Sequence, residues 1–222
     1  MNISQKACLA VAAALVSSIA FAAPAVAAEG PYWAPLQAWF DEHGVDDATQ
    51  DELIAKLAAG EVLDSMKPTA EPVSVDVSEN GHSRISTFED GSIVVDEIRQ
   101  ANDGVGTFAI SGCSYYNGSG YASASGCLIV SGNGMLELRF RASYSWGSFG
   151  GSIGSATSPE AVVLYGSATS PPSLSIVRAN SSGSLPAVAT AHTLYTHQNG
   201  TYSEDMYLSL RVDSTGGWTT QY

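Results

Sequence analysis

The chain has little positive charge. It carries 9 lysine and arginine residues against 22 aspartate and glutamate residues, for a formal net charge of −13. Nucleic-acid binding requires a basic face, so this balance argues against it. The same balance argues against charge-driven adhesion to an anionic membrane, and solubility outside a cell is its simplest interpretation.

Long apolar runs are also scarce, and the one that raises the question of a membrane span lies at the N-terminus. Lys6 precedes this run, Pro24 interrupts any helix, and small residues follow. The run is shorter than the roughly 20 apolar residues that a spanning helix needs. A basic start, a short apolar run and an A-x-A ending predict a secretory signal peptide over residues 1–28. We therefore expect a secreted, extracellular protein that starts at Ala28 or Glu29 and has no membrane contact after cleavage.

Cysteine is rare, with three residues in the whole chain. Cys8 lies in the predicted signal peptide, which leaves Cys113 and Cys127 in an oxidising compartment. An even pair predicts one disulfide, worth about 3 kcal/mol by the loop-entropy model. The alternative is a metal site or a catalytic thiol. The wide spacing and the lack of a nearby histidine disfavour it, so we expect no metal site and no cofactor.

Sequence motifs of catalysis are absent as well. There is no G-x-S-x-G elbow, no H-E-x-x-H, no P-loop and no calcium-binding loop. Histidine occurs four times, and His192 and His197 should point to opposite faces of a strand, which is wrong for two ligands of one metal. No catalytic residue is identified, and whether the protein is an enzyme stays open, with a non-enzymatic role favoured.

Acidic residues are concentrated in the first part of the exported chain. Residues 29–103 hold 17 acidic and 4 basic residues, whereas residues 104–222 hold 5 acidic and 4 basic residues. Beyond Asp103 the composition shifts toward Gly, Ser, Ala and Thr. We therefore predict an acidic α+β N-terminal region over 29–103 and a β domain over 104–222.

The N-terminal region shows two helical patterns and then a strand pattern. Leu36, Trp39 and Phe40 form one apolar stripe of a helix over 35–43, and a second helix follows Asp46 and ends near Gly60. After Pro68 the apolar residues alternate, with turn signals at 80–81 and 90–91. This predicts a short acidic helical hairpin followed by a three-stranded β-meander.

The remainder of the chain is dominated by strand patterns. Alternation is cleanest over 136–146 and 206–212, and further strands are expected at 161–165, 174–178 and 187–197. Several strands separated by Gly, Ser and Pro loops favour an antiparallel β-sandwich, with a barrel as the alternative. The hexapeptide Gly154–Pro159 recurs unchanged at Gly166–Pro171. One interpretation is that the two copies form equivalent turns on either side of one strand, and the other is a recent slip in the gene.

Three tyrosines, Tyr115, Tyr116 and Tyr121, lie among small polar residues between the two paired cysteines. Tyr together with Ser, Gly and Asn is a composition suited to recognition. Sugars and wall polymers are the expected ligands of exposed tyrosines. The alternative is that Tyr115 or Tyr121 packs against the sheet.

Several stretches carry a resemblance to known proteins. They are the acidic hairpin Gly44–Met66, the segment Thr87–Ser92 of the meander, and the span from Ile110 through Cys113 to Cys127. In these stretches the chain resembles uncharacterised secreted proteins of high-GC Gram-positive (actinobacterial) bacteria. The resemblance implies a secreted bacterial origin and carries over no activity, substrate or catalytic residue.

Three functional classes remain from the sequence. The first is a non-catalytic binding or cell-surface module, whose partner is a cell-surface polysaccharide or protein. The second is a secreted hydrolase that acts on polysaccharide or cell wall. The third is a precursor whose acidic region 29–103 is processed off.

Overall fold

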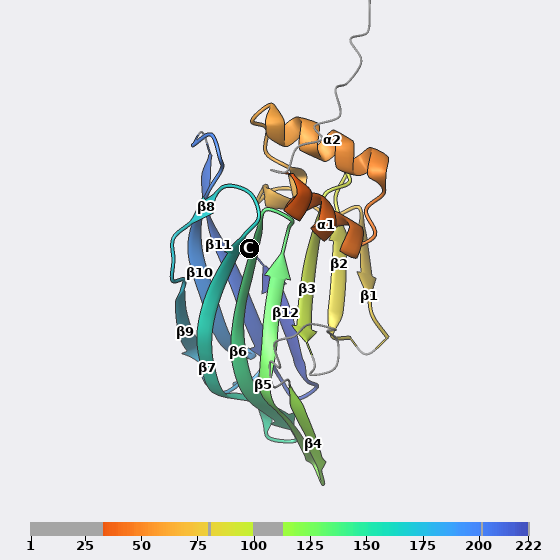
Figure 1. Ribbon diagram of the computed structural model, residues 1–222. Helices are drawn as coiled ribbons and strands as arrows, with labels where there is room; N and C mark the ends of the chain where they lie inside the picture. Colours follow the sequence, from red (N-terminus) through yellow and green to blue (C-terminus); the bar gives the residue numbers. More distant parts are fainter. Residues whose placement is uncertain (1–32, 80, 100–112, 201, 222) are drawn as a thin grey trace, which may run out of the picture.

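The computed structural model describes residues 33–79, 81–99, 113–200 and 202–221. The predicted signal peptide and the predicted boundary near Asp103 lie outside these residues. The described chain forms two short helices and two antiparallel sheets, with the helices over one end of the sheets (Figure 1). This confirms a mainly β, antiparallel sandwich preceded by a helical hairpin and a meander. Within the described ranges, no helix is long and apolar enough to cross a membrane.

The helical hairpin consists of α1 (Ala34–Glu42) and α2 (Asp47–Ala58), followed by a short 3-10 helix, η1 (Asp64–Met66). Asp46 caps α2, because its carboxylate accepts hydrogen bonds from the backbone N–H and the hydroxyl of Thr49, at 3.1 and 2.7 Å. Gly44 joins the helices at a φ of +74°. A residue with a Cβ rarely adopts this left-handed conformation, so glycine suits this position.

The larger sheet has seven antiparallel strands in the order β1-β2-β3-β5-β6-β7, and β4 pairs with the first half of β5. β1 to β3 are the predicted meander, and β3 continues directly into the later part of the sheet by pairing with β5. The strands are β1 (Ser74–Val77), β2 (Ser83–Thr87), β3 (Ile93–Arg99), β4 (Ser114–Gly118), β5 (Tyr121–Gly132), β6 (Leu136–Gly147) and β7 (Gly150–Val163).

The smaller sheet has five strands in the order β12-β11-β10-β8, and β9 also pairs with β10. Its edge strand β12 packs against β3 and β5, so β1 and β2 extend past that edge. The strands are β8 (Ser167–Ala168), β9 (Ser173–Arg178), β10 (Ala187–Thr196), β11 (Ser203–Val212) and β12 (Gly217–Gln221).

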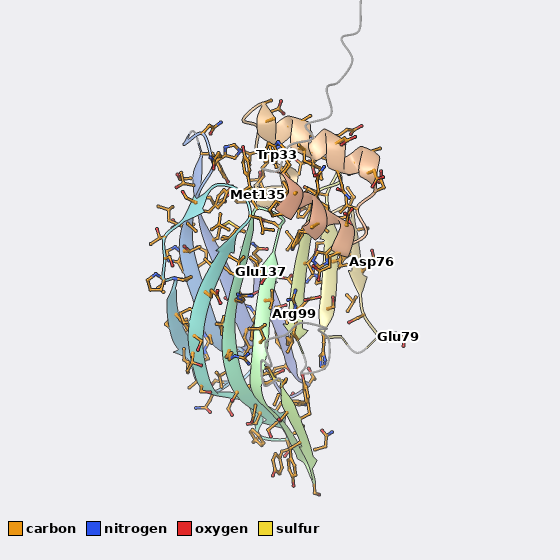
Figure 2. The ribbon with its side chains drawn as sticks, in the orientation of Figure 1. Trp33, Asp76, Glu79, Arg99, Met135 and Glu137 are labelled. Atoms are coloured by element: carbon orange, nitrogen blue, oxygen red, sulfur yellow. A yellow bond between two sulfur atoms is a disulfide. The ribbon has the colours of Figure 1, made fainter. Side chains whose placement is uncertain are left out.

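One hydrophobic core joins the helices to both sheets. At Gly134, in the turn between β5 and β6, an added Cβ would lie 3.1–3.2 Å from the side chains of Leu36, Trp39 and Phe40. The hydroxyl of Tyr165 donates to the carbonyl oxygen of Leu57 at 3.2 Å. Figure 2 shows Trp33 and Met135 at this helical end of the molecule. The acidic N-terminal region therefore packs as part of the same core as the later strands.

The two copies of the repeated hexapeptide adopt different structures, so the expectation of equivalent turns is wrong. The first copy, Gly154–Pro159, lies inside β7 and pairs with β6, where Ser155 faces Ser143. In the second copy Gly166 makes a turn at a φ of +93°, and only Ser167–Ala168 pair, with the end of β10. Because the two copies have the same local sequence, their different conformations come from the strands with which they pair, β6 for the first copy and β10 for the second.

Candidate functional site

The two predicted disulfide cysteines lie at the base of the β4–β5 hairpin. Cys113 and Cys127 are at disulfide distance, with their Cα atoms 4.0 Å apart, which confirms the predicted pairing. Between them, β4 and the first half of β5 project at the end of the molecule opposite the helices (Figure 1).

The alternation of β4 places the predicted tyrosines on two different faces. Tyr115 points inward, where its ring stacks on His82 at 5.5 Å and meets the edge of Trp146 at 6.4 Å. Burial raises the pKa of Tyr115, and also that of its neighbour Tyr144. Tyr115 therefore contributes to the packing of this end of the sandwich.

Tyr116 and Tyr121 lie together on the outer face. Their exposed fractions are 57% and 43%, and their ring centroids are 5.6 Å apart with the planes inclined by 41°. A Cβ added at Gly118 would lie 2.6 Å from the Tyr121 ring and 3.1 Å from the Tyr116 ring. The glycine therefore leaves the space in which the two rings sit over the hairpin backbone.

A third exposed aromatic side chain lies on the neighbouring β6–β7 turn. The β6–β7 turn adjoins the β4–β5 turn, because the backbone N–H of Ser148 donates to the carbonyl oxygen of Gly120 at 3.2 Å. That turn carries Phe149, which is 59% exposed. We call Tyr116, Tyr121 and Phe149 the aromatic tip. The sequence analysis did not select Phe149. A large apolar residue within the turn sequence Gly-Ser-Phe-Gly is the signal that indicates an exposed aromatic side chain here.

The strand segments next to the aromatic tip carry hydroxyl groups and no charged side chain. By strand register, Tyr116 shares its face with Ser123, Ser145 and Ser152 on the three neighbouring strands. The hydroxyls of Ser145 and Ser152 are 2.9 Å apart. Residues 114–126 and 142–159 include no acidic or basic residue and no histidine, in a chain with a net charge of −13.

A pocket, which we call the intersheet cleft, lies where β2 and β3 pass the edge strand β12. Its volume is about 430 Å³, within the range of small-molecule pockets. A smaller cavity of about 120 Å³ shares Arg84 and Asp96 with it. The cleft is lined by the segment that follows η1, by β2 and β3, and by β11 and β12: Ser65, Met66, Lys67, Pro68, Ala70, Pro72, Arg84, Ser86, Phe88, Val94, Asp96, Glu204, Met206, Thr220 and Gln221.

Asp96 lies deep in this cleft, with an exposed fraction of 6%. Burial raises the pKa of its carboxyl, against the opposing effects of the Ser131 hydrogen bond and the Arg84 charge. The Ser131 hydroxyl lies 2.6 Å from Asp96 Oδ1 and 2.8 Å from Gln221 Oε1. A hydroxyl has one proton, and with the Gln221 amide turned so that its Nε2 donates to Ser131 Oγ, the Ser131 hydroxyl donates to Asp96. Ser131 thereby links Asp96 of the larger sheet to Gln221 of the smaller sheet.

Glu204 reaches the same cleft from the smaller sheet. Burial raises the pKa of its carboxyl, and the charge of Asp205 adds to the effect. Its Oε2 atom is buried and has no hydrogen-bond partner within the described chain. Sequence analysis did not select Asp96, although an aspartate directly after the apolar run Ile93–Val95 is a usable signal.

Ser173, His192 and Asp205 lie across β9, β10 and β11. Asp205 Oδ1 is 2.7 Å from His192 Nε2, and the Ser173 hydroxyl is 3.5 Å from His192 Nδ1. The order of groups is that of a nucleophile, a base and an orienting carboxylate. The set is open to water, since the side chains of His192 and Asp205 are 35% and 59% exposed.

Across the described ranges, no group of three or more His, Cys, Asp and Glu side chains is arranged to hold a metal ion.

Comparisons with known proteins add a distant likeness to a solved structure. No family model matches the chain, and no curated protein matches it either. Among solved structures, a crystal structure of a hypothetical protein from Listeria monocytogenes is 18% identical to this chain. The match covers 63% of this chain and 98% of that chain with a TM-score of 0.35. A TM-score this low supports neither a shared fold nor a shared function.

Proposed function

We propose that this chain is a secreted bacterial binding protein, non-catalytic, that recognises a cell-surface polysaccharide through its aromatic tip. The observation that carries the proposal is the exposure of Tyr116 on β4, Tyr121 at the start of β5 and Phe149 on the adjoining β6–β7 turn, with exposed fractions of 43–59%. Exposed apolar groups gathered at one place typically mark an interaction site, whereas scattered ones need no explanation.

The chemistry of the tip suits a neutral, hydroxyl-rich polymer. Aromatic rings pack on the apolar faces of sugar rings, and tyrosine adds a hydroxyl for hydrogen bonding. The adjoining serines supply further donors and acceptors, and neither strand segment beside them carries a charge. Segments 114–126 and 142–159 supply no Asp, Glu, Lys, Arg or His side chain, so we favour a neutral polysaccharide over a protein or an ionic polymer.

A pull-down on insoluble cell-wall polysaccharide tests the proposal. The exported chain is mixed with the polymer, and the bound fraction is measured for Tyr116→Ala, Tyr121→Ala and a matched control, Tyr207→Ala. Tyr207 is an exposed tyrosine on β11, 37% exposed and stacked on His192, outside the aromatic tip. Aromatic anchors at the centre of an interface contribute about 1–2 kcal/mol or more, so each tip variant should bind roughly tenfold more weakly.

The control decides the interpretation. Retention of the wild type and of Tyr207→Ala, with loss in both tip variants, supports the proposal. Equal retention of all variants would mean that the tip is not the contact surface, and a wild type that does not bind would remove the proposed ligand.

Ester hydrolysis is the second candidate function, favoured by the arrangement of Ser173, His192 and Asp205. In such a reaction the serine oxygen attacks the ester carbonyl carbon while the imidazole takes the hydroxyl proton. The C–O bond of the ester then breaks, the imidazolium protonates the departing alcohol, and water hydrolyses the acyl-enzyme to release the acid. Hydrolysis of p-nitrophenyl acetate that is lost in both Ser173→Ala and His192→Ala would support it. Equal rates for these variants and the wild type would exclude this set as the source of activity.

A further inference from the structure

Two carboxyl groups from opposite sheets line the intersheet cleft. Asp96 enters it from β3 and Glu204 enters it from β11, positions 108 residues apart in the chain. Within the described part of the chain, neither carboxylate forms an ion pair with a basic side chain. A carboxylate that is buried without a cation is costly, and a ligand that supplies the cation offsets that cost.

The basic side chains of the cleft leave this charge largely uncompensated. Lys67 Nζ lies 2.6 Å from Asp64 Oδ1, so it is already engaged by another carboxylate. Arg84 is exposed, and its attraction for Asp96 is outweighed by the effect of burial. Asp205 adds negative charge beside Glu204. The groups that face the two carboxyls from β2, β11 and the η1 segment therefore leave a net attraction for a cation.

The rest of the lining is apolar enough to bury a carbon chain. Met66, Phe88, Val94 and Met206 line the same cleft, and all four are buried. Methionine side chains adapt to irregular apolar ligands. A cleft of about 430 Å³ has room for a small ligand with a polar head and an apolar stem.

We propose that the intersheet cleft binds an organic ligand through a primary ammonium group, which the carboxylates of Asp96 and Glu204 receive while the apolar lining holds its stem. A free alkylamine, a lysine side chain and an amino sugar all carry this group. The site is distinct from the aromatic tip, so it does not depend on the proposed polysaccharide binding.

Calorimetric titration with n-butylammonium tests the proposal, with n-butanol as a neutral ligand of similar size. An affinity of roughly 0.1–10 mM is expected for so small a ligand. Binding of the amine should strengthen as pH rises and the two carboxyls ionise, and butanol should bind at least tenfold more weakly. Lysine amide and glucosamine then distinguish a peptide-derived amine from an amino sugar.

Two variants and a matched control locate the site. Glu204→Gln and Asp96→Asn keep the side-chain shape, remove one charge each, and should weaken amine binding roughly tenfold or more. The control Asp205→Asn removes the same charge one residue away, from a side chain that is 59% exposed and bonded to His192. It should change affinity less than about threefold, because an exposed charge is screened by solvent.

Three results would overturn the proposal: equal binding of butylammonium and butanol, unchanged affinity in both cleft variants, or an equal loss in Asp205→Asn. Circular dichroism of each variant confirms that it is folded before titration. The cleft variants should retain polysaccharide binding and the tip variants should retain amine binding, so failure of one proposal is distinguishable from failure of the other.

Discussion

Phe40→Ala probes whether the acidic N-terminal region is part of the fold or a detachable precursor segment. Phe40 has an exposed fraction of 0% and packs with α1 against the turn that contains Gly134. A buried phenylalanine removes on the order of 150–250 Å² from water, which is about 4–6 kcal/mol at 25 cal/mol per Å². Mutational data on Phe→Ala in cores give about 3–5 kcal/mol. We expect a loss of about 4 kcal/mol in the free energy of unfolding.

Urea denaturation measures this loss when helix and strand signals are followed together. With a urea m-value of about 2 kcal/mol per M, the midpoint should fall by about 2 M for both signals. The control Glu52→Ala changes an exposed residue of α2 and should stay within about 0.5 kcal/mol of the wild type. If Phe40→Ala shifted the helix signal alone, the hairpin would be an independent unit. That outcome would favour the precursor hypothesis over a shared core.

Two further predictions concern stability. Because burial raises the pKa of Asp96, the folded state holds this proton more tightly than the unfolded chain, and ionisation destabilises the fold as pH rises. Asp96→Asn should therefore raise the melting temperature near about pH 8 and have little effect near about pH 3, below the ordinary carboxyl pKa; equal shifts at both pH values would contradict this. Cys113→Ser should lower the free energy of unfolding by about 3 kcal/mol, the loop-closure value, and reduction of the wild type should reproduce the loss. An unchanged urea midpoint would show that the bond does not stabilise the fold.

Much of the fold can be predicted from local patterns in this chain. The stripe Leu36, Trp39 and Phe40 predicts α1, and the alternation over 136–146 predicts β6, because each pattern reports burial on one side of an element. The repeated hexapeptide marks the limit of this reasoning. Its first copy is held in β7 by pairing with β6, and no property of the six residues themselves distinguishes it from the second copy.

The candidate sites were less accessible to sequence reasoning, for physical reasons. The composition of the cysteine-bounded loop predicts exposed tyrosines, but the face of each depends on the register of β4, which turns Tyr115 inward. Asp96 and Glu204 line one cleft only because β12 packs beside β3 and pairs with β11. Contacts between sheets of this kind leave no periodic signal. The sequence therefore indicates the aromatic tip in part and does not indicate the cleft.

The aromatic tip is the central claim, and a heteronuclear NMR titration with a soluble fragment of the cell-wall polysaccharide tests it most directly. We predict that the largest shift changes occur at the backbone amides of Tyr116, Gly118, Tyr121 and Phe149, with little change in the helical hairpin. These ligand-induced shift changes should disappear in the Tyr116→Ala variant. In the absence of ligand, the spectrum of this variant should otherwise match that of the wild type. Shift changes confined to the intersheet cleft, or none at a saturating concentration of the fragment, would contradict the account.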